Sequence, residues 1–367
     1  MYRRVAGVGL ALTMLVAGCG HSSSISQGPA TSSTPVPSVA TSSTRAASAT
    51  SQAARDLPDP HTLRGLTEVP ELPDPKPVEG SSAQKLPVTV TDVEGNKVTI
   101  KSTSRILALD LYGTLSRTLI GLGLGDKIVG RTVSSTEKQL HDRPVVTENG
   151  HVLNVEAVAG LKPSVIIADR SVGPKEALDQ LRKSGIPVVL VDPHRSVGST
   201  PQLIRTIADA VGKPDAGEAL VKRTQEQIDQ AKKQIAAWKP AKPMRVAFLY
   251  VRGNAGVFFI LGSENGASEL IQGVGADDVA SDKGITTLVP ANAESLVSIN
   301  PDAIFVMRDG LASTGGMKGL LARAGVANTT AGRKQRVISI PDGISLSFGP
   351  QTGEVLTAVA KALYGVK

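Results

Sequence analysis

Tyr250 and Arg252 are the residues whose types and spacing most directly suggest chemistry. They end the run Met244-Arg-Val-Ala-Phe-Leu-Tyr-Val-Arg252, which is typical of a β-strand. Side chains two positions apart on a strand point to the same face, so the guanidinium would lie beside the phenol. A neighbouring positive charge favours the phenolate, a hard anionic ligand that is well suited to ferric iron.

His151 is a second candidate ligand, in the segment Asn149-Gly-His-Val-Leu just before a helix predicted to begin near Asn154. A histidine alone in a loop is more often a solvated side chain, and a tyrosine followed by an arginine is commonly a packed ring beside a surface charge. His194, in a polar loop after a predicted strand, is a minor competitor. These residues therefore need a scaffold that brings them together.

Cys19 is the only cysteine of the chain, so no disulfide and no cysteine-based metal site can form. It follows a basic start and an apolar run over residues 5–16, closed by Val16-Ala-Gly-Cys19. The run is too short to remain as a membrane-spanning helix, and the cysteine matches the bacterial lipobox. The sequence thus predicts a lipoprotein signal peptide over residues 1–19, with Cys19 lipidated and the protein anchored outside the cytoplasm.

Several other classes of function find little support. The net charge of +7 is spread along the chain without a dense basic block, which argues against nucleic-acid binding. The chain has no G-x-S-x-G elbow, no H-E-x-x-H motif and no cysteine nucleophile, so an envelope hydrolase is the least favoured alternative and we expect no enzyme. The glycines between Gly121 and Gly125 follow a helical pattern and are interpreted as a helix end.

Short apolar runs indicate the elements that must position the candidate residues. The alternation from Leu86 to Ile100, broken at Glu94-Gly-Asn, predicts a hairpin. The runs at 106–110, 165–169 and 188–192 are continuously apolar and separated by helical stretches. Strands of this kind are buried on both faces, which predicts a parallel sheet covered by helices.

The chain also repeats itself. The segment Asn154–Asp169 recurs as Asn292–Met307 without a gap, and each copy is followed by another strand. Between the copies, Pro214 to Trp238 is rich in good helix formers and is stopped by Pro240. The sequence therefore predicts an α/β fold of two Rossmann-like lobes joined by a single long helix.

The predicted boundaries follow from these patterns. Residues 20–85 are predicted to form a disordered or extended tether. Gly20 to Gln52 is rich in Ser, Thr, Ala and Pro, and the proline-rich segment Leu57 to Pro77 is predicted to be extended and to lie on the folded body. Residues 86–198 form the first lobe, 199–240 the linking helices and 241–367 the second lobe.

The lipobox, the hairpin, the repeated unit and the linking helix resemble the ABC-importer binding proteins for haem, cobalamin and siderophores. Asn149–Leu153 and Leu249–Gly256 are similar to the haem-uptake lipoproteins of the HmuT type. The resemblance covers Leu86 to Lys367 and implies a class III periplasmic-binding-protein-like fold. It implies haem as the transported ligand; a ferric siderophore or cobalamin remains the alternative.

The resemblance also implies roles for particular residues. His151 and Tyr250 would be the axial ligands of ferric haem iron, one from each lobe, with Arg252 supporting the tyrosine. Independently of the resemblance, Met307 ends a predicted strand at the position equivalent to Asp169, so its thioether could contact the haem face or replace Tyr250 as an iron ligand; core packing is almost as good an interpretation. Further residues could line the pocket or contact the haem propionates: Tyr112, Phe258, Phe259, Arg170, Arg195 and Arg308.

Glu156 and Glu294 occupy equivalent positions in the two repeats. By resemblance they would dock onto a two-fold permease, whereas their local pattern also fits a first-turn glutamate that is favourable to the helix dipole. The expected partners are the permease and ATPase subunits of a haem importer, haem itself and the membrane through the lipid anchor. We expect a monomer and no nucleic acid.

Overall fold

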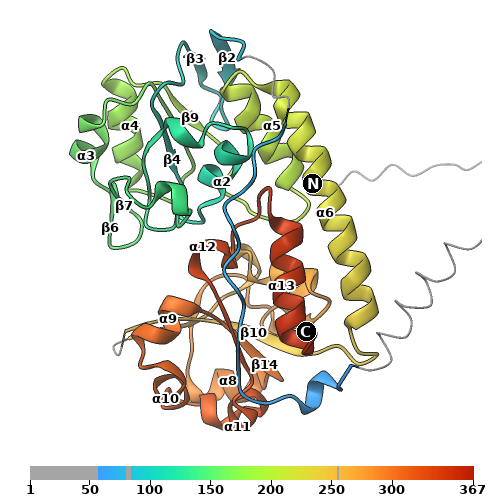
Figure 1. Cartoon of the computed structure of the whole chain (residues 1–367). Helices are drawn as coiled ribbons and strands as arrows, with labels where there is room; N and C mark the ends of the chain where they lie inside the picture. Colours follow the sequence, from blue (N-terminus) through green and yellow to red (C-terminus); the bar gives the residue numbers. More distant parts are fainter. Residues whose placement is uncertain (1–56, 80–83, 254–255) are drawn as a thin grey trace, which may run out of the picture. The chain divides into compact units, whose positions relative to one another are not determined.

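The computed structural model of the chain describes residues 57–79, 84–253 and 256–367 (Figure 1). Cys19, the predicted signal peptide and most of the predicted tether lie outside these ranges. Within them, no helix is both long enough and apolar enough to cross a membrane.

The first lobe is built on a four-stranded parallel sheet in the order β5-β4-β8-β9. The three apolar runs that predict it are strands, and their side chains are buried in alternation by two separate core clusters, one on each face. The predicted hairpin is confirmed as the antiparallel pair β2 and β3. The elements of this lobe are β2 (Val88–Thr91), β3 (Lys97–Ile100), β4 (Ile106–Leu109), α2 (Thr114–Gly121), β5 (Ile128–Gly130), β6 (Thr147–Glu148), β7 (Val152–Leu153), α3 (Val155–Gly160), β8 (Val165–Ala168), α4 (Lys175–Lys183), β9 (Val188–Leu190) and α5 (Thr200–Ala210).

The second lobe has a mixed sheet in the order β1-β15-β14-β10-β11-β13, in which the edge strand β1 is Leu66–Glu68 and β12 lies beside the start of β10. Its centre is parallel, and β11 and β13 add an antiparallel edge. The elements of this lobe are β10 (Arg245–Arg252), β11 (Val257–Ile260), α7 (Ala267–Gly273), β12 (Asp277–Asp278), β13 (Val289–Pro290), α8 (Ala293–Ile299), β14 (Ala303–Met307), α9 (Arg308–Ser313), α10 (Gly316–Leu321), α11 (Thr330–Lys334), β15 (Val337–Ile340), α12 (Asp342–Ser345) and α13 (Thr352–Tyr364).

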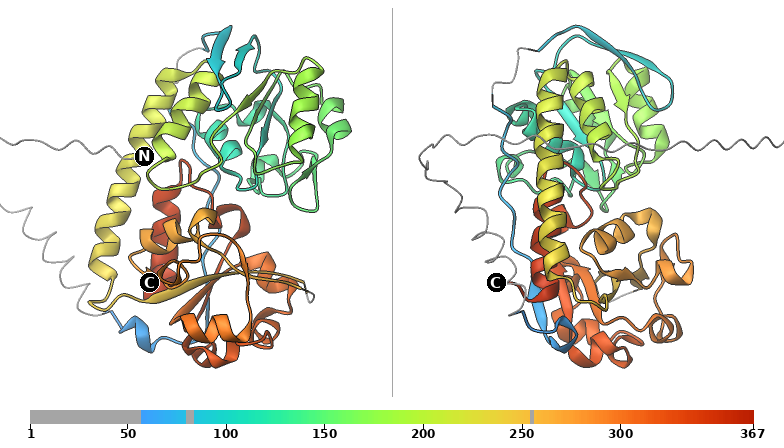
Figure 2. Two further views of the ribbon diagram at one scale, coloured as in Figure 1. Left: turned by 180° about the vertical axis from the view of Figure 1, so that it is seen from behind. Right: turned by 90° about the vertical axis from the view of Figure 1, so that its right-hand side faces the viewer.

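Helix α6 (Pro214–Trp238) has the predicted bounds and belongs to both cores. Its first half contributes Leu220 and Val221 to the core of the first lobe. Its second half contributes Ala231 and Ile235 to the core of the second lobe. In Figure 2 it runs beside α5 and α13, which it contacts. Because one face of each half packs into a lobe, α6 acts as a stiff connection between the lobes.

Residues 57–79, here called the N-terminal strap, are part of the folded body. Its strand β1 (Leu66–Glu68) pairs in parallel with β15 of the second lobe. Farther along, the carboxylate of Asp74 accepts hydrogen bonds from the backbone N–H groups of Lys138 and Gln139 in the first lobe. The folded body thus begins before Leu86, where the alternation pattern placed its start. A three-residue edge strand between prolines is too short to leave a periodic signal.

The lobes also meet through α2 and the segment that carries α12. Arg117 of α2 donates from Nε to the carbonyl oxygen of Gly343 at 3.2 Å and from Nη1 to Gln351 at 2.8 Å. Its guanidinium is buried beside the carboxylate of Glu137, 3.4 Å away. A buried charge of this kind is tolerated because it is paired and hydrogen-bonded.

Candidate functional site

The predicted pair Tyr250 and Arg252 lies at the end of β10 on one face of the second-lobe sheet. The guanidinium carbon of Arg252 is 5.3 Å from the centroid of the Tyr250 ring. Phe259 faces Tyr250 on the neighbouring strand β11. Both members of the pair are partly exposed, whereas Val251 between them is buried in the core. The alternation of the strand therefore places phenol and guanidinium side by side, as the sequence predicts.

Arg252 is held by residues from two other strand ends. Its Nη2 lies 2.5 Å from Oδ1 of Asp342, which follows β15, and 3.6 Å from the sulfur of Met307, which ends β14. Because β10, β14 and β15 are parallel, their carboxyl ends meet at one edge of the sheet. Partial burial acts to lower the pKa of Arg252, but the Asp342 carboxylate and the Tyr250 phenol outweigh it and raise that pKa.

His151 lies in the turn between β6 and β7. Asn149 and Gly150 adopt positive φ angles of 49° and 89°, which turn the chain sharply before the histidine. The carbonyl oxygen of His151 accepts a hydrogen bond from the backbone of Gly173 at 2.9 Å, and the residue is exposed. Within the described ranges its imidazole forms no hydrogen bond or ion pair. His194 is instead paired with Asp192, at 2.8 Å.

The three arginines predicted to contact propionates are engaged elsewhere. Arg170 forms ion pairs with Glu94 at 2.8 Å and Asp179 at 2.9 Å on the outside of the first lobe. Arg308 binds Glu71 at 2.7 Å and the carbonyl oxygen of Val69, which ties the strap to the second lobe.

Arg195 is buried beneath the ring of Tyr112, with its guanidinium carbon 5.7 Å from the ring centroid. It pairs with the buried carboxylate of Asp169, and Asp110 lies 3.9 Å away. Asp110 and Asp169 follow β4 and β8, so this cluster marks the carboxyl edge of the first-lobe sheet. Tyr112 packs against the core cluster of the second lobe. Arg195 thus neutralises part of a buried acidic pair.

Burial, together with the neighbouring charge of Asp169, raises the pKa of Asp110 to about 7, although Arg195 opposes the shift. A raised carboxyl pKa stabilises the fold when the group is protonated, and this contribution is lost as pH rises from about 4 through about 7. We therefore expect the free energy of unfolding of the wild type to fall as pH rises through this window, by up to about 1.4 kcal/mol per pH unit more than that of Asp110→Asn. Urea unfolding at a series of pH values measures this. Asp142→Asn, at an exposed aspartate, is the control; parallel curves for wild type and Asp110→Asn would contradict the prediction.

The two predicted pocket phenylalanines, Phe258 and Phe259, lie on opposite faces of β11. Phe259 lies on the face of Tyr250, across the pair β10–β11. Phe258 points to the opposite face, where it is 8% exposed in the core and Arg323 lies over its ring. Phe258 therefore packs in the core and not beside Tyr250, because neighbouring residues of a strand alternate between faces.

Residues 111–343, more than half of the chain, match the periplasmic binding protein family. The chain belongs to this family. The heme binding protein HmuT has a solved structure that is 49% identical and covers 84% of this chain and 100% of its own, with a TM-score of 0.83. HmuT has also been solved with a single histidine, tyrosine or arginine replaced by alanine.

Two curated relatives are more distant. The ABC transporter substrate-binding lipoprotein YvrC of Bacillus subtilis is 27% identical over 76% of this chain and 86% of its own length. The cobalamin-binding protein of Halobacterium salinarum is 24% identical over 80% of this chain and 78% of its own. The predicted two-lobe α/β class and the resemblance to importer binding proteins are confirmed. The family and these relatives are binding proteins rather than enzymes.

The two glutamates predicted to dock onto a permease occupy matching places in this member of the family. Glu156 and Glu294 are exposed in the first turns of α3 and α8. Each helix is capped by an asparagine: Asn154 accepts from the N–H of Ala157 at 2.9 Å, and Asn292 from that of Ser295 at 2.8 Å. The repeat therefore presents the same acidic helix start in both lobes.

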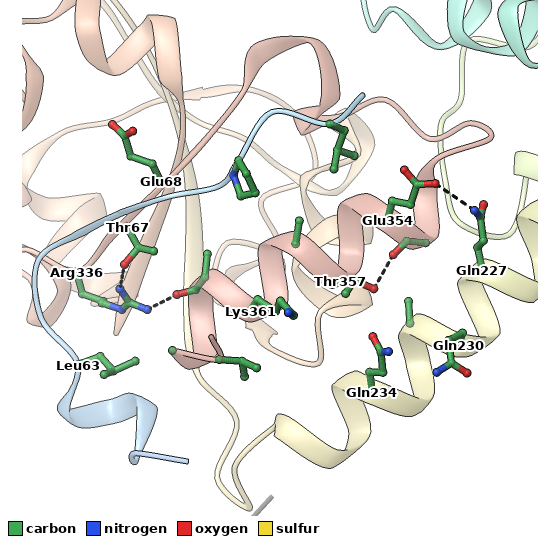
Figure 3. Close-up of a pocket in the computed structure, with 18 of the residues that line it drawn as sticks. Leu63, Thr67, Glu68, Gln227, Gln230, Gln234, Arg336, Glu354, Thr357 and Lys361 are labelled. Carbon is green, nitrogen blue, oxygen red and sulfur yellow. Dashed lines mark hydrogen bonds between the residues drawn. The ribbon is translucent and has the colours of Figure 1, made fainter. Parts of the chain in front are cut away.

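A cavity of about 950 Å³ lies between the N-terminal strap, α6 and α13 (Figure 3). Its walls include Gln230 and Gln234 of α6 and Thr357 of α13. Neither Tyr250 nor His151 lines it. The cavity is therefore separate from the Tyr250–Arg252 pair and from His151.

Sequence reasoning missed Asp342 and Gly310, which both touch Arg252. A signal was available for the aspartate, because Asp110, Asp169 and Asp342 all stand directly after, or one residue after, a buried strand. Polar groups in that position of an open α/β sheet gather at its ligand edge. Nothing in the local pattern around Gly310 indicates its role, since contact with Arg252 arises only when α9 packs against β10.

Proposed function

We propose that this chain binds ferric haem between its lobes, with Tyr250 and His151 as iron ligands, and delivers it to the permease of an ABC importer. The observation that carries the proposal is the Tyr250–Arg252 pair at the ligand edge of the second-lobe sheet. A phenol beside a fixed guanidinium is suited to bind as a phenolate, because the cation stabilises its negative charge. Tyrosine is an established ligand of haem iron.

The likeness to HmuT supports the same residues. The histidine, tyrosine and arginine replaced in the HmuT variants have the spacing of His151, Tyr250 and Arg252 in this chain. HmuT is described as a heme binding protein, and 49% identity over its whole length supports a shared ligand. In this proposal Phe259, Met307 and Tyr112 contribute apolar surface to the pocket.

A cobalamin-binding function is the second candidate, because a relative of that name aligns with 80% of the chain. Its identity is only 24%, and cobalamin binding leaves the fixed phenol–guanidinium pair without a purpose. A ferric siderophore is a further possibility within the same class of importer. We propose no catalytic step for the protein.

Titration of the purified, ligand-free protein separates these candidates. We expect haemin to give a saturable Soret band at one haem per chain, with the spectrum of a ferric tyrosinate-ligated haem. Cyanocobalamin and a ferric siderophore, titrated in parallel by intrinsic fluorescence, should not compete with haemin. Protein that remains colourless with haemin, or that prefers cobalamin, would contradict the haem proposal.

We also propose that Cys19 is lipidated and becomes the first residue when residues 1–18 are removed, so that the monomeric protein is held at the outer face of the cell membrane. The lipobox pattern supports this, as does the description of YvrC as a lipoprotein. The intact mass of the mature protein, compared with that of Cys19→Ser, tests it: an unmodified N-terminus in both would contradict lipidation.

A further inference from the structure

Asp342 uses both carboxylate oxygens to join separate parts of the second lobe. Oδ1 lies 2.5 Å from Nη2 of Arg252, at the end of β10. Oδ2 accepts a hydrogen bond from the backbone N–H of Asp309 at 2.8 Å, in the first turn of α9. The side chain of Asp342 is 18% exposed and that of Arg252 is 34% exposed, so the ion pair is partly shielded from water. Charge-assisted hydrogen bonds of this kind are stronger and more directional than neutral ones.

The space around Arg252 leaves its guanidinium little freedom. The Tyr250 ring lies on one side, and the sulfur of Met307 is 3.6 Å from Nη2. A Cβ atom at Gly310 would lie 2.6 Å from Nη1 of Arg252, so only glycine lets α9 approach this closely. Among the described residues, Asp342 is the one carboxylate that forms an ion pair with Arg252. It therefore decides how the guanidinium is aimed.

The segment that carries Asp342 is itself fixed against the first lobe. The carbonyl oxygen of the next residue, Gly343, accepts the hydrogen bond from Arg117 of α2. Gly343, Ile344 and Ser345 are buried, and a Cβ atom at Gly343 would collide with the side chain of Thr136 of the first lobe. The carboxylate thus belongs to a turn that touches both lobes.

We infer that Asp342 is a positioning residue for the Tyr250–Arg252 pair: it holds the guanidinium over the phenol from a turn that is anchored to the first lobe. In the haem site this fixes the cation beside the iron-bound phenolate, and it makes the aim of Arg252 depend on the contact between the lobes. The part concerning haem rests on the proposed function; the orientation of Arg252 does not.

Asp342→Asn is the test, and Asp309→Asn is the matched control. Asp309 is adjacent in space and exposed, and within the described part of the chain its side chain forms no ion pair with Arg252. In the haem-loaded protein we expect Asp342→Asn to speed haem loss to apomyoglobin by about tenfold, the usual scale for a group that orients a metal ligand. The iron–phenolate band in the resonance Raman spectrum should shift. Asp342→Glu should restore both in part.

A second measurement needs no haem. The Nε–H signal of Arg252 in the NMR spectrum of the ligand-free protein should move in Asp342→Asn and stay in place in Asp309→Asn. If wild type fails to bind haem while this signal responds, the haem proposal fails and the positioning role stands. If Asp342→Asn matches Asp309→Asn in the NMR signal, the positioning role is wrong.

Gly310→Ala guards against a folding defect in Asp342→Asn. It keeps every charge and places a methyl group 2.6 Å from Nη1 of Arg252 and 2.6 Å from the carbonyl oxygen of Val251. We expect the same direction of change in haem loss and in the Raman band, because the guanidinium must move. An unchanged Raman spectrum in a folded Gly310→Ala protein would overturn the inference that the orientation of the Arg252 guanidinium affects the iron-bound phenolate.

Discussion

Tyr250→Phe is expected to lower the affinity for ferric haem by at least about 100-fold, or roughly 2.7 kcal/mol. The substitution removes one oxygen and keeps the ring that packs beside Phe259. The lost oxygen is the anionic ligand, and Arg252 is then left beside a ring with no negative charge to stabilise. The measurement is the dissociation constant from Soret titration, together with loss of the phenolate band from the Raman spectrum.

His151→Ala should have a smaller effect on the same titration. His151 is an exposed, neutral ligand in a turn, so it supplies less electrostatic stabilisation to ferric iron than a phenolate that is partly buried beside a cation. Tyr112→Phe removes a hydroxyl from the other tyrosine that lies over an arginine and should change the affinity least. Undisturbed spectra in both Tyr250→Phe and His151→Ala would remove these residues from the site.

The double variant Glu156→Ala, Glu294→Ala is expected to bind haem within about twofold of wild type and to lose most haem-dependent growth in cells. Both carboxylates are exposed and have equivalent places in the two lobes, as a two-fold partner would require. Complementary charges across an interface chiefly set the rate and register of association. Haem uptake by cells that carry the variant at normal abundance measures the loss.

The competing explanation is that these glutamates only stabilise the helix starts, for about 0.3–1 kcal/mol each. Glu176→Ala with Asp309→Ala removes two exposed acidic groups from the first turns of α4 and α9 and serves as the control. If both double variants lose similar stability and transport haem equally, the docking role is wrong. A loss of haem binding by the Glu156, Glu294 variant would contradict it as well.

Much of the fold could be predicted because buried positions are occupied by apolar residues, whose spacing along the chain follows the secondary structure. Continuous apolar runs marked the buried parallel strands β4, β8 and β9, and the repeat marked two related lobes. Helix propensity and a terminal proline defined α6 to the residue. Strand β1 of the N-terminal strap was not predicted, because its three residues become a strand only by pairing with β15, which lies far along the chain.

The Tyr250–Arg252 pair shows the same division between local pattern and tertiary structure. Its shared face follows from strand alternation alone, which is a local property of the backbone. The partners of each arginine were decided only by tertiary structure. Asp342 forms an ion pair with Arg252, and Asp169 forms one with Arg195. These aspartates lie at the sheet edges because parallel strands bring their carboxyl ends together, whatever their separation in sequence. Local patterns record which side chains are buried; the packing of distant strands decides which charges meet.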